Sequence, residues 1–191
     1  MLSHGIDVDQ RCAAFGFSLR DISNIPAALQ SRLQWTLWRQ FSRAGKTAKV
    51  PWSVYDKPAS STDSSTWHDF ETVVVQYREG YHAGLSFALV DGGGIVGVDF
   101  DGCRDPETGE VDEWAMRWLR QLPGYAEISP SGTGVKLFVR SNILLRKGIN
   151  KKLDLPAKYG KSPGIEVYSG RRFFAVTGQA LPGFAGGLRD E

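Results

Sequence analysis

Hydrophobic and polar residues alternate along most of this chain in short runs, a pattern typical of β-strands. In residues 34–41, for example, Trp35, Leu37 and Arg39 fall on one face of an extended segment. A DGGG sequence separates two such runs, and glycine-rich turns of this kind favour a β-hairpin. Strands are predicted at residues 34–41, 50–54, 84–90, 94–100, 125–129, 135–140, 165–168 and 172–177.

Helical periodicity is confined to a few segments among these strands. Pro26 opens the first of them, since proline is tolerated in the first turn of a helix. A second carries apolar residues at helical spacing, and the polar loop before it offers Asp63, Ser64 or Ser65 as an N-cap. The predicted helices cover residues 26–33, 67–79 and 112–122. Many strands with few helices predict an α+β domain.

Composition narrows the class of protein. The 191 residues are 41% hydrophobic and 12% aromatic, which suits one globular domain, with residues 1–24 predicted as a tail because they lack periodicity. No apolar run reaches the length of about 18 residues that a membrane helix needs, and the sequence MLSHGIDVDQ lacks the features of a secretory signal. Two cysteines, Cys12 and Cys103, make neither a disulfide framework nor a cysteine-based metal site, which predicts a cytoplasmic protein without a membrane partner.

The segment IVGVDFDGC, residues 95–103, is the most informative local pattern. Side chains alternate along a strand, so Asp99 and Asp101 share a face. Neighbouring carboxylates repel each other unless a cation lies between them, and Mg²⁺ prefers oxygen ligands of this kind. A third acid, Glu166, stands in the apolar strand GIEVYSG and would complete a set able to hold two metal ions for nucleotidyl displacement. The alternative is a turn with solvated acids, because D-x-D-G is a common turn composition.

Two other metal-binding interpretations of this segment fit poorly. An EF-hand loop beginning at Asp99 would require glycine where Arg104 stands and an oxygen ligand where Cys103 stands. A phosphatase of the haloacid dehalogenase type also uses D-x-D-G after an apolar strand, but there the motif lies on the first strand and threonine follows it. Here the motif lies mid-chain and Cys103 follows it.

A glycine-rich turn runs directly into the strand at residues 135–140. Successive backbone N–H groups in such a turn can cradle an anion, and hydroxyl groups add donors. Lys136 begins two residues past the turn, within reach of a triphosphate held there. A tight turn beside a solvated lysine is the alternative. The turn residues proposed to bind phosphate are Ser131, Gly132, Thr133 and Gly134.

Positive charge gathers between residues 140 and 161, where Asp154 is the single acid. A run of charge is either a solvated loop or a surface that follows a phosphate backbone, and the residues alone leave both possibilities open. The basic residues are Arg140, Arg146, Lys147, Lys151, Lys152, Lys158 and Lys161.

Three motifs in this order and spacing, VGVDFDGC, EISPSGTGVKLFV and GIEVYSGRRFFAVTG, resemble the archaeo-eukaryotic primase superfamily. The best match is to the primase-polymerase domains of phage and plasmid replication proteins, over about residues 25–183. The resemblance implies a primase-polymerase domain at residues 25–185, followed by a tail at 186–191. Within this domain it implies an N-terminal α/β unit at 25–83 and a catalytic unit related to the RNA-recognition motif at 84–185.

The resemblance also implies template-directed nucleotidyl transfer with Mg²⁺ or Mn²⁺, nucleoside triphosphates and a single-stranded or primed DNA template, with a helicase domain or protein as a further partner. Asp99, Asp101 and Glu166 match the metal-binding catalytic acids. Lys136 takes the position where many members have a phosphate-contacting histidine, and Arg172 matches a basic position near the triphosphate. The residues expected to hold nucleic acid are Lys49, Arg146, Lys147, Lys151 and Lys152, with the nucleotide as the alternative ligand of Lys49.

A catalytically weak, nucleic-acid-binding module of a replication initiator is the alternative function. The three acids favour the enzyme, whereas the missing histidine favours the binding module. An initiator of the relaxase type is disfavoured, because the sequence holds no His-x-His pair.

Overall fold

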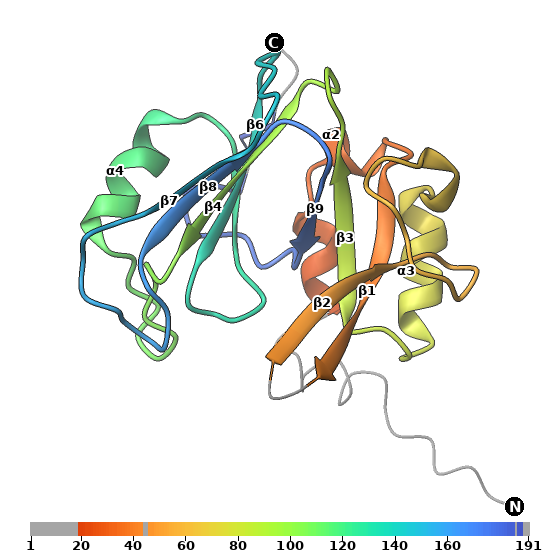
Figure 1. The fold of residues 1–191 in the computed structure, drawn as a ribbon, viewed down its shortest axis with the longest axis horizontal. Coiled ribbons are helices and arrows are strands. Elements are labelled where there is room, and N and C mark those ends of the chain that lie inside the picture. The colour runs from red at the N-terminus through yellow and green to blue at the C-terminus, as the bar shows by residue number, and fades with distance from the viewer. Residues whose placement is uncertain (1–18, 44–45, 186, 189–191) are drawn as a thin grey trace, which may run out of the picture.

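The computed structural model describes residues 19–43, 46–185 and 187–188, which form two antiparallel β-sheets (Figure 1). The first sheet has the order β2–β1–β3–β9, with β1 Trp35–Arg43, β2 Lys46–Trp52, β3 Gly84–Leu89 and β9 Arg172–Val176. The second has the order β5–β6–β4–β8–β7, with β4 Ile95–Asp101, β5 Tyr125–Ile128, β6 Val135–Arg140, β7 Ile149–Lys152 and β8 Gly164–Tyr168. The α+β prediction is therefore confirmed.

Helices cover the outer faces of both sheets. In Figure 1, α3 (Phe70–Arg78) lies outside the first sheet and α4 (Glu113–Gln121) lies outside the second. Two shorter elements, η1 (Leu19–Asn24) and α2 (Ala27–Gln30), precede β1, and η2 (Ser64–Thr66) precedes α3. None of the helices in the described part of the chain has the length and apolar character needed to span a bilayer.

The predicted hairpin between residues 84–90 and 94–100 is wrong. Both strands form, but β3 pairs with β1 and β9, whereas β4 pairs with β6 and β8. The glycine-rich turn still closes tightly, with the Gly93 amide donating to the Val90 carbonyl over 2.8 Å. The turn therefore carries the chain from one sheet to the other, because each strand finds its pairing partners in a different sheet.

Two local predictions also differ from the structure. Asp69, rather than Asp63, Ser64 or Ser65, caps α3, and its carboxylate accepts the Thr72 amide over 2.8 Å. The strand β7 was not predicted, because its four residues INKK are all exposed and show no hydrophobic alternation.

The sheets do not follow the predicted division at residue 84. Strands β3 and β9 lie within residues 84–185 yet join β1 and β2 in the first sheet. Both predicted tails contribute to the core. Ile22, near the end of the tail at 1–24, is buried there, and so is Leu188 of the tail at 186–191. Residues 1–18 of the first tail, and 186 and 189–191 of the second, lie outside the described residues.

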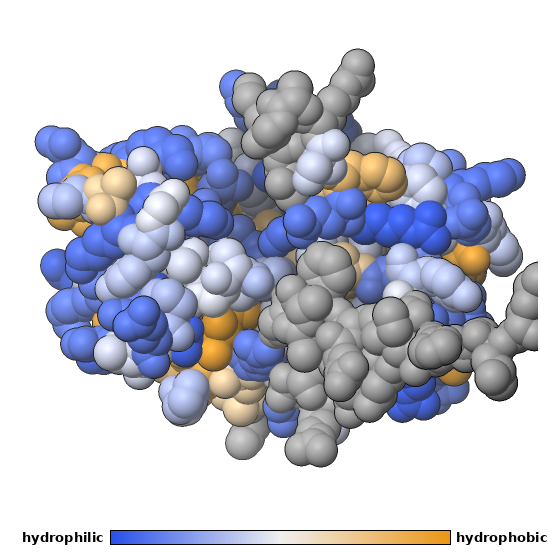
Figure 2. Space-filling view, turned by 90° about the horizontal axis from the view of Figure 1, so that it is seen from below, coloured by the Kyte–Doolittle hydropathy of each residue, from blue (hydrophilic) through white to orange (hydrophobic). Residues whose placement is uncertain are grey.

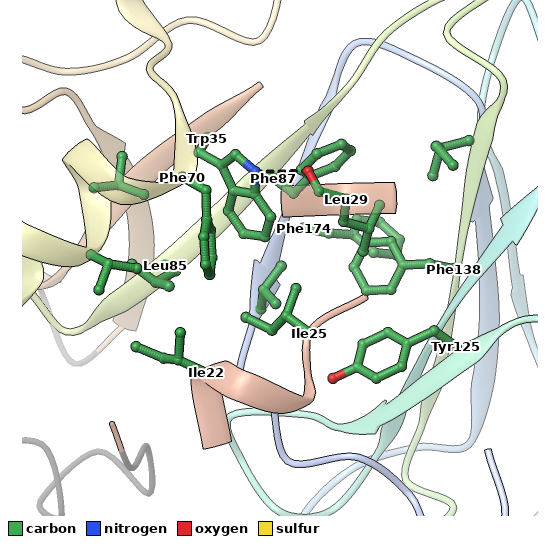
Figure 3. Close-up of a cluster of buried hydrophobic side chains, with 14 of the residues drawn as sticks. Ile22, Ile25, Leu29, Trp35, Phe70, Leu85, Phe87, Tyr125, Phe138 and Phe174 are labelled. Atoms are coloured by element: carbon green, nitrogen blue, oxygen red, sulfur yellow. Dashed lines mark hydrogen bonds between the residues drawn. The ribbon is translucent and has the colours of Figure 1, made fainter. Parts of the chain in front are cut away.

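One hydrophobic core joins the first sheet, the helices α2 and α3 and the inner face of the second sheet (Figure 3). On the first sheet Trp35 packs against Phe87, with ring centroids 5.1 Å apart. Phe138 of the second sheet lies 6.3 Å from Phe87 and 5.8 Å from Phe174 of β9. Aromatic rings thus connect the sheets, and such edge-to-face pairs stabilise a core beyond the area they bury.

A second core lies between the second sheet and α4. Phe100 and Leu137 face Leu119 of the helix, and all three are buried. In Figure 2, the described residues on the face seen from below are mainly hydrophilic, with hydrophobic residues in separate patches. Because α4 covers the outer face of the second sheet, the inner face contacts the first sheet, and most charged residues of the strands lie on this inner face.

Replacing Phe138 with alanine should destabilise the fold by about 3–5 kcal/mol, because the side chain is fully buried between the sheets. Val75 on α3 is 61% exposed, so Val75→Ala should change the free energy of unfolding by no more than about 0.5 kcal/mol. Urea unfolding followed by tryptophan fluorescence measures both. Equal losses in the two variants would contradict a core shared by the two sheets.

Candidate functional site

The middle of the second sheet carries a row of polar side chains across all five strands. Strand pairing sets Asp99 opposite both Lys136 and Glu166, while Glu127 pairs with Lys136 and Asn150 with Glu166. Directly paired residues point to the same face of a sheet. We call this row, Glu127–Lys136–Asp99–Glu166–Asn150, the charged rung.

Each carboxylate at the centre of the charged rung has a donor partner. The Lys136 ammonium donates to Asp99 and lies 4.6 Å from the ring centroid of Phe174. Glu166 accepts from the Asn150 side chain and, over 3.0 Å, from the Tyr168 hydroxyl. These pairs matter because a partly buried carboxylate is costly to hold without a hydrogen-bonding or cationic partner.

Asp101 lies one rung further along β4 and faces the same side as Asp99. It pairs with Gly164, and its carboxylate accepts from the Lys161 ammonium over 2.9 Å. Lys152 of β7 pairs with Gly164 from the other side, so it shares this face. Glycine at position 164 leaves room above the strand, and the Lys152 side chain leans over it.

Strand β9 of the first sheet crosses the charged rung. Its first residue, Arg172, lies 3.5 Å from the Glu166 carboxylate on β8. Phe174 in its middle lies beside Lys136 on β6, and Gly97 on β4 admits the ring because any side chain there would collide with it. Just past its end, Thr177 donates its amide to Glu127 on β5 over 2.9 Å.

A cleft of about 410 Å³ opens beside this crossing and is lined by residues of both sheets. The first sheet contributes an apolar wall that includes Trp38 and Pro51. The charged residues at the lining are Lys49, Asp99, Lys136, Glu166, Arg171 and Arg172. Four cations therefore face two carboxylates, an arrangement that favours an anionic ligand.

The pKa of Lys49 shows that its surroundings in the cleft destabilise a positive charge. Its ammonium lies 5.2 Å from the Trp38 ring centroid, although the residue as a whole is exposed. Desolvation of the ammonium, followed by repulsion from Lys136 and Lys161, lowers the pKa of Lys49 to about 8. A bound anion would relieve this repulsion.

The structure brings Lys49, Asp99, Lys136, Glu166 and Arg172 together at one cleft. The glycine-rich turn at 131–134 stands apart from this lining, at the end of the second sheet that Asp101 approaches. Its hydroxyl groups bond one another, with Ser131 2.9 Å from Thr133, and Arg104 donates to the Gly132 carbonyl.

The predicted nucleic-acid residues of the basic segment are spread over different surfaces. Arg146 and Lys147 lie in the connection from β6 to β7. Lys151 and Lys152 face opposite sides of the second sheet, because neighbouring residues of a strand alternate. Lys158 and Lys161 bind the acids Asp112 and Asp101.

The three predicted acids supply the oxygen donors that Mg²⁺ and Mn²⁺ prefer, and they share one face of two paired strands. As placed, no three His, Cys, Asp or Glu side chains among the described residues gather closely enough to hold a metal ion. Lys136, Lys161 and Arg172 instead neutralise Asp99, Asp101 and Glu166. The donor chemistry therefore fits a divalent cation that would replace these side-chain cations.

Sequence reasoning missed Glu127 and Asn150. Both lie in short strands, and only pairing across the sheet places them beside Lys136 and Glu166. A charged residue between apolar neighbours in YAEI was an available signal for Glu127, but it gave no indication of a partner.

Glu127 is fully buried, and burial raises its pKa to about 7. The amides of Thr177 and Gly178, the Tyr125 hydroxyl and the charge of Lys136 act in the opposite direction, since they stabilise the carboxylate. Folding therefore takes up a proton at Glu127 between the ordinary glutamate pKa of 4.5 and about 7.

This proton uptake predicts a pH dependence of stability. Because the native state binds more protons than the unfolded state in this window, the contribution of Glu127 to stability should fall as the pH rises from about 4.5 to about 7. Glu127→Gln should remove that fall, so the free energies of unfolding of the two proteins should diverge across the window and run parallel above it. Denaturant unfolding at a series of pH values measures this, and parallel curves throughout would contradict it.

Known proteins include a relative of this chain, although no protein-family model matches it. A DNA primase-polymerase of Nitratiruptor phage NrS-1 is 32% identical over 168 residues, which cover 85% of this chain. The chain spans only 22% of the length of that relative. The chain is therefore homologous to part of a phage primase-polymerase, the family that its three motifs resemble.

Proposed function

We propose that this chain is a nucleotidyl transferase domain that extends a primer on a DNA template. The main structural support for this function is the charged rung, where the acids Asp99 and Glu166 lie beside the cations Lys136 and Arg172 in one cleft. Homology to a phage DNA primase-polymerase supports the same activity. The second sheet with α4 on one face is consistent with a core related to the RNA-recognition motif.

The acids Asp99, Asp101 and Glu166 would hold Mg²⁺ or Mn²⁺. When bound, the divalent cation supplies activation of the attacking hydroxyl and neutralises charge on the leaving pyrophosphate. With the metal site filled, the Lys136 ammonium, which now pairs with Asp99, would be available to a phosphate oxygen.

Lys136, Arg172 and Lys49 would bind the triphosphate of the incoming nucleotide. Their charges converge on the cleft before the substrate arrives, so they stabilise the charge that develops on the leaving group without reorganisation. The glycine-rich turn at 131–134 remains a predicted phosphate contact from the neighbouring end of the sheet. The template would contact Lys152, which shares the face of the acids, and Arg146 and Lys147 remain predicted template contacts in the connection before β7.

A binding module of a replication initiator, without catalysis, remains the competing function. The observation in its favour is that side-chain cations neutralise all three acids. The two functions differ in one measurable respect, because only the enzyme incorporates nucleotides. Template binding with no metal-dependent incorporation would identify the binding module.

Asp99→Asn should lower metal-dependent incorporation of a labelled nucleotide on a primed template by at least about 100-fold, because it removes a charge from the metal site. Asparagine keeps the size of the side chain and an acceptor oxygen for the buried Lys136 ammonium, and circular dichroism checks that the variant remains folded. Glu113→Gln, an exposed change on α4, is the matched control and should leave the rate unchanged. Retained activity in Asp99→Asn would refute the assignment of the site.

Replacing either of two neighbouring lysines should have different effects on template binding. Lys152 shares the face of Asp101, whereas Lys151 faces the side of α4. The logarithm of the binding constant falls linearly with the logarithm of the salt concentration. Lys152→Gln should reduce the steepness of this fall by about 0.7–0.9, because one contact that releases a counterion is lost. Lys151→Gln should leave the slope unchanged. Fluorescence anisotropy with a labelled oligonucleotide measures both slopes. Equal slopes for the two variants would exclude this template path.

A further inference from the structure

Glu127 is a buried carboxylate that the proposed reaction does not use. Its side chain has no exposed surface, although burying a carboxylate is unfavourable without strong partners. The partners are unusual because two of them are backbone amides from the other sheet. Thr177 and Gly178 donate to its two oxygens over 2.9 and 3.0 Å.

These amides follow directly after β9, the strand that crosses the charged rung. Glu127 lies on β5, the edge strand of the second sheet. One carboxylate therefore fastens the end of a first-sheet strand to the second sheet. Two further bonds run along the same seam, from the Thr177 hydroxyl to the Ile128 carbonyl and from the Ile128 amide to the Gln179 carbonyl.

The length of β9 matches the width that it crosses. Five residue steps separate Arg172 from Thr177, which is roughly 17 Å of extended chain. From β8 to β5 there are three strand spacings, which together are roughly 14 Å. Pairing with β3 holds β9 in the first sheet, and the contact with Glu127 fixes its end against the second sheet, where Phe174 lies against Lys136 and Arg172 against Glu166.

We propose that Glu127 is a positioning residue, which holds the end of β9 and thereby sets Arg172 and Phe174 over the charged rung. Its carboxylate is suited to this task because each oxygen accepts one amide N–H. A carboxamide offers one acceptor oxygen and turns an NH₂ group toward the second amide. The consequence for nucleotide binding rests on the function proposed above, whereas the placement of β9 does not.

Glu127→Gln tests this proposal by its effect on binding rather than on chemistry. The nucleotide KM should rise by about tenfold while kcat changes by less than about threefold, since the reacting acids are untouched. Tyr125→Phe is the matched control, because it removes the hydroxyl donor to the same carboxylate and leaves both amide bonds. That variant should keep the KM of the wild type. An unchanged KM in Glu127→Gln, or an equal rise in both variants, would overturn the proposal.

A second measurement is independent of activity. In ¹H–¹⁵N spectra, Glu127→Gln should shift the amide signals of Thr177 and Gly178 and also the Nε–H signal of Arg172, at the far end of β9. If the chain proves inactive, a shift at Arg172 still supports the positioning role, and an unmoved Arg172 signal overturns it.

Should Glu127→Gln fail to fold, a pH titration of the wild type replaces it. The Thr177 amide and the ring protons of Phe174, in the middle of β9, should then titrate together as Glu127 is protonated. Independent titration of the two signals would overturn the proposal.

Discussion

The crossing of β9 over the charged rung is the contact on which the site depends. A β-sheet with one face buried normally places apolar residues there, and Phe138 and Tyr125 do so at one end of the second sheet. Further along the same face the residues become ionic, and the core between the sheets gives way to a cleft. This boundary is stable because every carboxylate on the rung has a donor from a neighbouring strand or from β9.

The same arrangement explains why opposite charges can lie close together in this cleft. Lys136 is buried, with an exposed fraction of 7%. It contacts Asp99 in the sheet and Phe174 in β9. An ammonium in such a place is held by its partners rather than by water. A ligand that supplies both a divalent cation and phosphate oxygens would satisfy both members of the Lys136–Asp99 pair, which is the chemical sense of the nucleotide assignment.

Sequence periodicity predicted the α+β class and most strands, because alternation reports directly which face of a strand is buried. The Asp99–Asp101 spacing also predicted that these two side chains share a face. By contrast, the DGGG turn predicted a hairpin that does not exist, since a turn reverses the chain without specifying its pairing partner.

Positions that depend on pairing between distant strands were the ones sequence could not predict. Lys152 faces the acids and Lys151 does not, yet the composition of the basic segment gives no difference between the two lysines. The role of Glu127 depends on residues 50 and 51 positions further along the chain. Such contacts follow from how the two sheets cross, and no local pattern encodes that crossing.

An experimental structure with Mn²⁺ and a non-hydrolysable nucleoside triphosphate would show whether the acids bind metal and whether the cleft binds nucleotide. Anomalous scattering from manganese would locate the metal without reference to any expected geometry. We expect a manganese peak between Asp99, Asp101 and Glu166, with the triphosphate on Lys136 and on Arg172 of β9. A nucleotide bound away from this cleft, or manganese bound elsewhere with Lys136 still paired to Asp99, would contradict this expectation.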